Sequence, residues 1–361
     1  MNSESCKVAI IGAGFAGLSA AISLARKGFK NIHVFYDQND KHAASHSAHG
    51  MSTIKGILEA DDDLFSLKLE GHRGFHNWVE ELEEITGMSR SDRVWLKRVV
   101  EKFKSIKDFR KDFGRIYRRD FIGAKNVRLE FSEPDCFASA IYPDDFWIDP
   151  EYLLQLLETS ARMLGVCLRH GRVAKIIANG KFSTLLFEDQ SRVICDVVVV
   201  AAGAGSSKLI DSIQLQKKIN LLGVAGLTFE VDTHDAQRSN VKGINSLVST
   251  QNRAFWGSTS DPARALQNLA EFMAPSSGEA EQVGSNLLRL FEPPLSVQKK
   301  IKWKWGVRVR SRNRSPVVMC IQPGSNIWIN SGYYKSGIIL SWLFAERVSE
   351  EIRQCSQPLN P

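Results

Sequence analysis

The stretch from Val8 to Asp37 constrains the fold more than any other part of the chain. An apolar run of strand length leads into Gly12-x-Gly14-x-x-Gly17, then into apolar residues at helical spacing and a β-branched and aromatic run over 32–36. This order of strand, glycine turn, helix and strand predicts a βαβ unit that binds a dinucleotide. Gly12 permits the tight turn, Gly14 leaves room for a pyrophosphate, and Gly17 lets helix and strand pack closely. The start of the helix offers N–H groups to the phosphates.

The end of the second strand departs from the usual dinucleotide-binding pattern. An acidic residue usually ends that strand and binds the adenosine ribose. Here Tyr36 stands at the strand end and Asp37 follows one residue later. Two interpretations remain open: Asp37 binds the ribose in a shifted register, or Tyr36 packs at that place. No arginine cluster follows that would bind a 2′-phosphate, so the sequence does not favour NADP.

Length and composition are those of a soluble globular protein with a substantial core. The chain has 361 residues, of which 43% are hydrophobic and 24% charged. The first residues lack a basic segment followed by a long apolar one, so we expect no secretory signal. No apolar run reaches the ~20 residues that a membrane span needs. The six cysteines are scattered, without a CxxC motif or metal-ligand spacing, which indicates reduced thiols, a cytoplasmic location and no metal site.

Positive charge is concentrated in two segments. Between Ser89 and Arg128 the sequence has 14 lysines and arginines against 5 acidic residues, and the run from Lys299 to Arg314 has 8 basic residues and no acidic one. Such clusters attract an anionic partner, such as tRNA, or an anionic substrate. The simpler interpretation is a solvated basic face without a partner.

Helical and strand patterns alternate along the rest of the chain. Asp149-Pro150, followed by leucines at helical spacing, predicts a helix that starts at Pro150 and ends before Gly165. The patterns also predict helices over 64–86 and 337–352, and strands over 166–169, 174–178, 183–187, 193–201 and 327–332. Since the nucleotide-type segments lie at the start, middle and end of the chain, we expect two interleaved domains.

Several short motifs share their order with one known family. Besides the glycine motif, they are Ala44-Ser45 to Gly50-Met51, Ile148-Asp149-Pro150 with ARMLGV at 161–166, VVVVAAGAG at 197–205, Trp305-Gly306-Val307-Arg308 with Arg314-Ser315-Pro316, and Gly332 to Ile338. In this order and spacing, the chain resembles the FAD-dependent amine oxidases of the D-amino-acid oxidase and glycine oxidase superfamily. The similarity covers nearly the whole chain.

The resemblance implies a fold and a division into domains. The fold class is α/β (α+β overall), with a Rossmann-like FAD-binding domain interleaved with a substrate domain built on a mainly antiparallel sheet. The FAD-binding domain would comprise residues 1–88, 146–212 and 306–361, and the substrate domain residues 89–145 and 213–305.

The resemblance also implies noncovalent FAD as the cofactor. His46 and His49 lie in the loop where some relatives attach FAD covalently, but the register differs, so we expect solvated or hydrogen-bonded histidines. The matching motifs assign the FAD contacts to Gly12, Ala13, Gly14, Phe15, Ala16, Gly17, Tyr36, Asp37, Ser45, Gly50, Met51, Val173, Ala202, Gly203, Gly306, Gly332, Lys335, Ser336, Gly337 and Ile338.

Arg308, Lys335 and Tyr334 are the candidate catalytic residues. Arg308 stands where the family binds the carboxylate of the substrate, and a planar guanidinium suits that pairing; otherwise it is one more member of a basic strand. Lys335, with the helix predicted from Gly337, would supply positive potential near the pyrimidine end of the flavin. Tyr334 lies in the same turn.

The remaining substrate contacts differ from the family pattern. Asn245 and Ser246 stand where the substrate strand often carries an aromatic residue or a histidine, which favours a substrate other than glycine or a simple D-amino acid. Four aromatic residues would help to exclude water from the site, although the simpler interpretation of each one alone is a core residue: Trp256, Trp305, Tyr333 and Tyr334.

Three functions are compatible with these observations. In the first, the chain is an oxidoreductase that transfers a hydride from the C–N bond of an amino acid or secondary amine to FAD, giving an imine that water hydrolyses. In the second, it acts on an aminomethyl-modified tRNA base, which the two basic segments favour. In the third, it is a non-catalytic flavin-binding subunit of a complex.

Overall fold

The computed structural model describes residues 4–40, 43–53, 62–88, 99–107, 109–110, 128–131, 137–213, 219–233, 238–242, 245–250, 252–257, 259, 274–291, 300–322 and 324–356. Two larger sheets organise these residues, one of six strands and one of eight. The basic segment 89–128 lies mostly outside the described residues. Within the described part of the chain, no helix combines the length and the apolar character that crossing a membrane requires.

The six-stranded sheet carries the glycine motif. Its order is β18-β19-β12-β1-β2-β8, and all neighbours are parallel except β18 and β19. The strands are β1 (Lys7–Ile11), β2 (Asn31–Tyr36), β8 (Cys167–His170), β12 (Val197–Val200), β18 (Val317–Cys320) and β19 (Ile327–Ser331). Parallel β1 and β2, joined by α1 (Phe15–Arg26), form the βαβ unit that the glycine spacing predicted.

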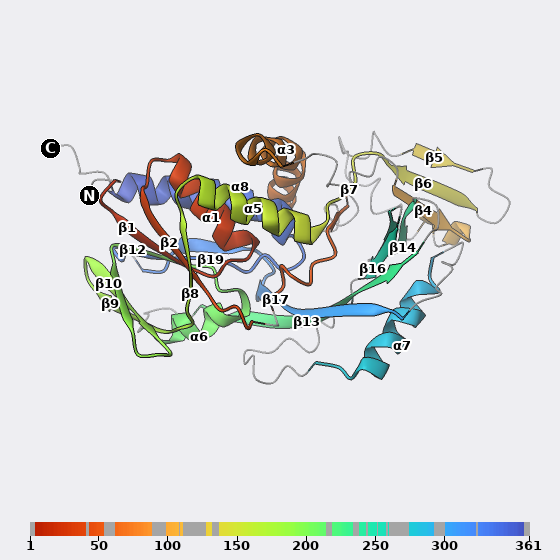
Figure 1. Cartoon of the computed structure of the whole chain (residues 1–361). Helices are drawn as coiled ribbons and strands as arrows, with labels where there is room; N and C mark the ends of the chain where they lie inside the picture. The colour runs from red at the N-terminus through yellow and green to blue at the C-terminus, as the bar shows by residue number, and fades with distance from the viewer. Residues whose placement is uncertain are drawn as a thin grey trace.

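Both faces of this sheet are covered, and the sequence alternation decides which residue meets which layer. In β1, Val8 and Ile10 pack among the helices, whereas Ala9 and Ile11 pack on the opposite side. The helices on one face are α1, α3 (Asp62–Thr86), α5 (Pro150–Met163) and α8 (Gly337–Ser356) (Figure 1). Because both faces are buried, the strands read as nearly continuous apolar runs, as the four valines of β12 do.

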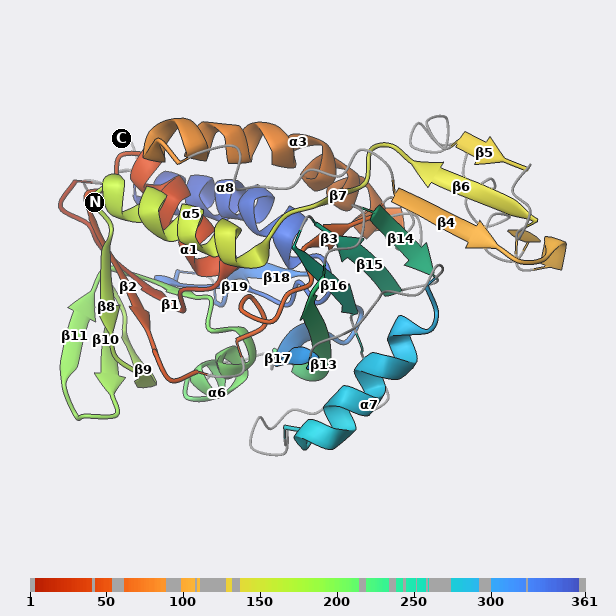
Figure 2. The ribbon, with the colours of Figure 1, turned by 45° about the vertical axis from the view of Figure 1, so that its right-hand side comes forward.

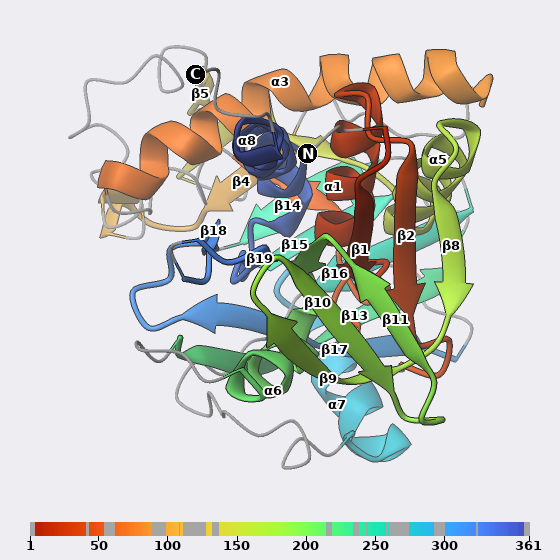
Figure 3. The same cartoon turned by 90° about the vertical axis from the view of Figure 1, so that its left-hand side faces the viewer.

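The opposite face of the six-stranded sheet meets a small antiparallel sheet (Figure 3). It consists of β9 (Val173–Asn179), β10 (Phe182–Phe187) and β11 (Arg192–Cys195), in the order β11-β10-β9. A short helical segment, η3 (Gly203–Gly205) with α6 (Ser206–Asp211), follows β12 on this side. The helices and strands predicted from the sequence here are confirmed, except that the run 193–201 forms two strands, β11 and β12.

The eight-stranded sheet extends away from the first, with the order β17-β13-β16-β15-β14-β4-β6-β5 (Figure 2). All its pairs are antiparallel except β14 with β4, so the prediction of a mainly antiparallel second sheet is confirmed. The strands are β4 (Val99–Phe103), β5 (Arg128–Glu130), β6 (Ala138–Tyr142), β13 (Leu221–Asp232), β14 (Arg238–Lys242), β15 (Asn245–Ser249), β16 (Arg253–Gly257) and β17 (Lys302–Ser311).

On one face, the part of the eight-stranded sheet formed by β13, β16 and β17 packs on α7 (Ser277–Leu288), whereas β4, β5 and β6 extend away from the rest of the molecule (Figure 2). In β13, Leu227, Phe229 and Val231 lie in the core with α7. The alternate residues Gly226, Thr228 and Glu230 therefore lie on the opposite face. A two-stranded ladder of β3 (Met51–Ser52) and β7 (Phe146–Trp147) links the segment after β2 to the start of α5.

Candidate functional site

A cavity of about 1500 Å³ lies at the carboxyl ends of the parallel strands. Gly12 after β1, Ala201 after β12 and Gly332 after β19 line it from the six-stranded sheet, and Gly226 and Arg308 line it from the eight-stranded sheet. In open α/β sheets, ligands bind in the crevice outside the carboxyl ends of the strands. The cavity therefore lies where a dinucleotide site is expected.

Nearly all residues predicted to bind the cofactor line this one cavity. They are Gly12, Ala13, Gly14, Phe15, Ala16, Tyr36, Asp37, Ser45, Gly50, Met51, Val173, Ala202, Gly203, Gly306, Gly332, Lys335, Ser336, Gly337 and Ile338. Gly17 is the exception, because it packs under the turn: a Cβ there would lie 1.9 Å from the carbonyl oxygen of Gly12. That these residues bind a cofactor stays a prediction.

The glycine turn is held by close backbone contacts. Gly12 has a φ of +111°, and a Cβ on it would lie 2.4 Å from the carbonyl oxygen of Ala201, so only glycine fits. At Gly14 the nearest atom to such a Cβ is the hydroxyl oxygen of Ser45, at 2.8 Å. The same hydroxyl accepts a hydrogen bond from the N–H of Phe15 at 3.1 Å. Ser45 thus joins the start of α1 to the loop over residues 43–53.

Tyr36 and Asp37 both line the cavity, so the two interpretations of the strand end stay open. The hydroxyl of Tyr36 lies 3.2 Å from the Nε2 atom of His170 on the neighbouring strand. One carboxylate oxygen of Asp37 accepts a hydrogen bond from the N–H of Asn39 at 2.8 Å, and the other lies 3.8 Å from the Nε atom of Arg172.

The loop over residues 43–53 is bound to β17 of the eight-stranded sheet and to β7. The hydroxyl of Ser47 donates to the carbonyl of Trp305 at 2.7 Å, and a Cβ on Gly306 would lie 3.0 Å from the Cβ of Ser47. At the other end, the indole N–H of Trp147 donates to the carbonyl of His49 at 2.7 Å. These contacts hold the loop as one wall of the cavity.

A buried histidine holds the end of this loop. The Nε2 atom of His72 lies 2.9 Å from the carbonyl of Asp144, so it carries the proton, and Nδ1 accepts from the hydroxyl of Ser52 at 2.9 Å. Burial lowers the pKa of His72 to about 4, so the ring is neutral at physiological pH. Since Ser52 lines the cavity, this pair connects the cavity wall to α3.

His49 is the residue whose role the sequence did not reveal. The sequence led us to expect solvated or hydrogen-bonded side chains at His46 and His49. His46 is exposed, as expected. The expectation is wrong for His49. Both ring nitrogens of His49 are buried and have no hydrogen-bond partner among the described residues, and burial lowers its pKa to about 4. A buried polar group without a partner costs roughly 1–3 kcal/mol. Because His49 lines the cavity, a bound molecule can supply that partner.

The turn before α8 forms another part of the wall. The Nζ atom of Lys335 lies 5.6 Å from the ring centroid of Tyr334, and the N–H of Tyr334 donates to the carbonyl of Val309 at 2.8 Å. Tyr334 has a φ of +53°, which is rare outside glycine. The α8 helix begins directly after, at Gly337, so its positive end opens into the cavity.

Arg308 comes to the cavity from β17. Burial lowers the pKa of its guanidinium, an effect that the nearby Tyr334 opposes. Its Nη2 atom donates to the carbonyl of Thr259. Arg310 lies two residues further along the strand and does not line the cavity; its Nη1 atom lies 3.5 Å from the carbonyl of Ser311. The structure thus brings the three candidate catalytic residues together in one wall.

The aromatic lining is only partly as expected. Tyr333 and Tyr334 line the cavity, as do the predicted substrate contacts Asn245 and Ser246. Trp256 does not, because it lies in the core with α7 and its indole N–H donates to the carbonyl of Gly284 at 2.9 Å. Trp305 lies in the same core. Both tryptophans are thus core residues, which was the simpler interpretation of the sequence for each of them.

Comparison with known proteins agrees with this geometry. The model of a family described as "FAD dependent oxidoreductase" matches residues 7–351. A curated relative, the bifunctional protein ThiO/ThiG of Synechocystis sp., is 24% identical over 96% of this chain and 51% of its own length. The chain therefore spans about half the length of this curated relative.

Solved structures share the fold over almost the full chain. Iminodiacetate oxidase from Chelativorans sp. BNC1 superposes with a TM-score of 0.79 and 20% identity, covering 98% of this chain and 97% of that one. Glycine oxidase from Geobacillus kaustophilus superposes with a TM-score of 0.76 and 20% identity, covering 98% and 95%. Likeness at this level of identity establishes the fold.

Proposed function

Because the chain belongs to the FAD-dependent oxidoreductase family, with FAD as its cofactor, we propose that it oxidises the carbon–nitrogen bond of an amino acid or a secondary amine. The two similar solved structures are named as oxidases of iminodiacetate and glycine, which are both amino acids. The curated relative is about twice as long as this chain. The substrate is therefore our proposal and is not taken from that relative.

The residues of the cavity fit FAD bound noncovalently. The start of α1 and the turn from Gly12 to Gly17 would hold the diphosphate, and Val173 would meet the adenine. The loop over residues 43–53 and the start of α8 would hold the flavin ring. The proposal includes the domain division, with FAD held by residues 1–88, 146–212 and 306–361 and the substrate covered by residues 89–145 and 213–305.

In this proposal FAD supplies the hydride acceptor, and the protein binds and orients the substrate. The guanidinium of Arg308 binds the carboxylate, which fixes the carbon–hydrogen bond in one direction. Lys335 and the start of α8 place positive potential on one side of the cavity. Tyr333 and Tyr334 reduce its access to water. The observation that carries the proposal is that Arg308 lines the same cavity as the predicted FAD contacts.

Replacement of Arg308 tests the substrate assignment. Breaking a desolvated ion pair costs roughly 3–5 kcal/mol, so Arg308→Ala should lower kcat/KM for an amino acid by about a hundredfold to several thousandfold. Arg308→Lys should recover only part, since an ammonium cannot reproduce the planar fork. FAD content should not change.

Arg310→Ala is the matched control, because Arg310 lies on the same strand outside the cavity. It should leave kcat/KM nearly unchanged. Equal and mild losses at both positions would mean that the arginines form only a basic surface, and the carboxylate assignment would then be wrong.

A second candidate function, action on an aminomethyl-modified tRNA base, rests on the surface around β4, β5 and β6. Phe131 and Phe137 are 59% and 37% exposed and form an aromatic cluster with Phe109. Among the described residues, the basic side chains in this region are Lys102, Lys104, Lys107, Arg110 and Arg128. Exposed aromatic rings in a region that also carries basic residues suit stacked bases and a phosphate backbone.

A gel-shift titration with tRNA tests this candidate. Binding should weaken steeply between low and physiological salt, and Phe131→Ala should weaken it without changing oxidation of a small amine. No shift at low salt would remove the tRNA candidate. A protein that binds FAD but is reduced by no amine would instead favour a non-catalytic flavin-binding subunit.

A further inference from the structure

The place of Arg308 depends on a glycine of the neighbouring strand. In the β13–β17 pair, Arg308 lies opposite Val224 and Gly306 lies opposite Gly226. Gly226 is thus the diagonal neighbour of Arg308, within reach of a long side chain. The guanidinium occupies the space over this glycine: a Cβ on Gly226 would lie 1.5 Å from the Nη2 atom and 2.7 Å from the Cζ atom of Arg308. No larger residue fits there while Arg308 keeps this orientation.

A backbone carbonyl receives the guanidinium at the same place. Arg308 donates from Nη2 to the carbonyl oxygen of Thr259, and the Cβ built on Gly226 would lie 2.4 Å from that oxygen. Thr259 itself forms two hydrogen bonds with β13. Its N–H donates to the carbonyl of Leu227 at 3.1 Å, and its hydroxyl accepts from the N–H of Leu227 at 2.8 Å. The acceptor is therefore fixed to the residue that follows Gly226.

We propose that Gly226 and Thr259 are positioning residues that set the orientation of Arg308, and that they thereby decide selectivity for substrates with a carboxylate. Gly226 leaves the space that the guanidinium needs, and the carbonyl of Thr259 accepts a hydrogen bond from the Nη2 atom of that guanidinium. The inference rests on the proposed role of Arg308 as the carboxylate-binding residue. It adds two residues that lie outside the cofactor motifs and that no local sequence pattern identifies.

A guanidinium held in this way can bind a planar carboxylate without losing further side-chain freedom. The side chain of Arg308 is partly buried in the cavity wall, and an arginine that shifts by 1 Å no longer matches the two carboxylate oxygens. If Gly226 served only the packing of β13, its replacement would affect all substrates alike. If it positions Arg308, the loss must be confined to molecules that carry a carboxylate.

The test uses the FAD-loaded protein and glycolate, a small carboxylate without an amine, whose binding is followed by the change in visible FAD absorbance. Gly226→Ala should raise the Kd for glycolate by at least about tenfold, because the guanidinium is displaced. The same substitution should have no further effect in an Arg308→Ala background, since its target is then absent. A merely structural role would give equal losses in both backgrounds.

Thr259 provides a second and milder pair of variants. They test whether Arg308 is positioned by its neighbours even if Gly226→Ala does not fold. Thr259→Val removes the hydroxyl that accepts from Leu227 and should raise the Kd for glycolate by about three- to tenfold, as for the loss of one hydrogen bond. Thr259→Ser keeps the hydroxyl and should bind glycolate like the wild type. Equal Kd values for Thr259→Val and Thr259→Ser would overturn the role of Thr259.

The outcomes separate this inference from the function on which it rests. If the wild type does not bind glycolate, or if Arg308→Ala binds it equally well, the carboxylate site itself is wrong. If Arg308→Ala loses binding while Gly226→Ala and Thr259→Val keep it, only the positioning inference is wrong.

Discussion

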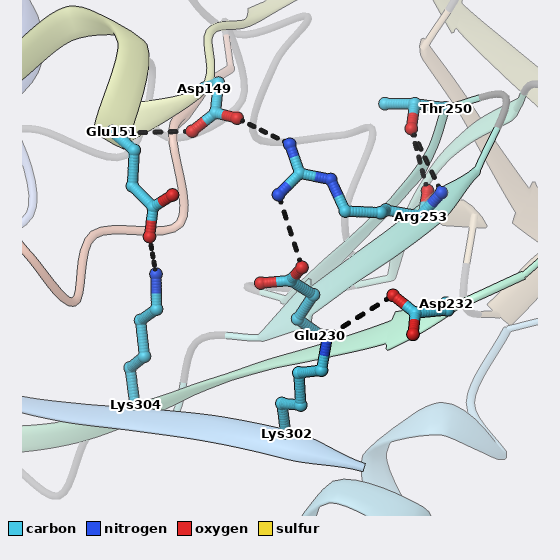
Figure 4. Close-up of polar contacts among 8 residues, drawn as sticks. All are labelled: Asp149, Glu151, Glu230, Asp232, Thr250, Arg253, Lys302 and Lys304. Carbon is cyan, nitrogen blue, oxygen red and sulfur yellow. Dashed lines mark hydrogen bonds and ion pairs between the residues drawn. The ribbon is translucent and has the colours of Figure 1, made fainter. Parts of the chain in front are cut away.

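The carboxylate of Asp149 and the guanidinium of Arg253 lie 2.9 Å apart and join the start of α5 to β16 (Figure 4). Asp149 also caps α5, accepting from the N–H of Glu151 at 2.9 Å. The same guanidinium lies 3.3 Å from the carboxylate of Glu230 on β13, and Lys304 of β17 pairs with Glu151. Two of these ion pairs connect a helix of the six-stranded sheet to β16 and β17 of the eight-stranded sheet, and the third joins β16 to β13.

Arg253→Met should lower the free energy of unfolding by about 1–2 kcal/mol, because it leaves two largely buried carboxylates without their shared cation. The side chains of Asp149 and Glu230 are only 13% and 15% exposed, whereas Arg253 is 39% exposed, which moderates the loss. Lys302→Met is the control, since its pair with Asp232 is mostly exposed; it should change stability by less than about 0.5 kcal/mol. Urea unfolding of the FAD-loaded protein measures the free energy of unfolding of both variants. Equal losses of stability would contradict a stabilising role for the ion pairs of Arg253.

Gly17→Ala should lose most of the bound FAD. The added Cβ would lie 1.9 Å from the carbonyl oxygen of Gly12, a backbone atom that can move only if the glycine turn moves. Gly278→Ala is the matched control, because Gly278 is exposed on α7 with no atom near its Cβ position. It should be neutral or stabilising by about 0.4–1 kcal/mol. The measurement is the ratio of FAD to protein after purification. A Gly17→Ala protein with a full complement of FAD would show that the glycine turn does not need the close contact at Gly17.

His49→Leu should change the stability of the apoprotein and its affinity for FAD in opposite directions. Without ligand, the buried imidazole has no partner among the described residues, so an apolar side chain of similar size should raise the free energy of unfolding. We expect FAD affinity to fall by about tenfold, since a bound polar group would lose its partner. Thermal unfolding of the apoprotein tests the expected gain in stability, and FAD titration tests the expected loss of affinity. An apoprotein that is destabilised, with unchanged FAD affinity, would contradict this role.

His72 should make stability depend on pH below neutrality. Its pKa is about 4 in the fold against an ordinary value of 6.5, so between these values the unfolded chain takes up a proton that the folded chain excludes. The contribution of each such histidine to the free energy of unfolding should therefore be constant above about pH 6.5 and fall by about 1.4 kcal/mol per pH unit as the pH drops towards 4. His49 contributes in the same direction. His72→Gln should reduce the slope between pH 6.5 and 5, and an unchanged slope would argue against a neutral His72.

The glycine motif and the loop motifs could be read from the sequence because their geometry is local. Gly12, Gly14 and Gly17 lie within one turn, and the strand and helix around them follow from short-range patterns. Arg308 was found through its place in a motif order shared with a family. Each of these signals depends on neighbours along the chain.

The features that the sequence did not reveal depend on distant neighbours. Gly226 matters because Arg308 crosses it from another strand, and nothing in its own surroundings distinguishes it from other glycines. The ring nitrogens of His49 are buried in a loop whose backbone is bound by Trp147 and Ile148, which lie far along the chain. The sequence could not decide between core and site for Trp256, because sequence alternation gives two faces to a strand but does not say which one meets α7.

The most direct test of the proposed function is reduction of the bound flavin without oxygen. FAD-loaded protein is mixed anaerobically with a panel of small amino acids, secondary amines and their decarboxylated analogues, and flavin absorbance is followed over time. The account predicts that at least one amino acid bleaches the flavin, that its decarboxylated analogue does so far more slowly, and that Arg308→Ala removes the difference. A flavin that stays oxidised with every amine in the panel would contradict it.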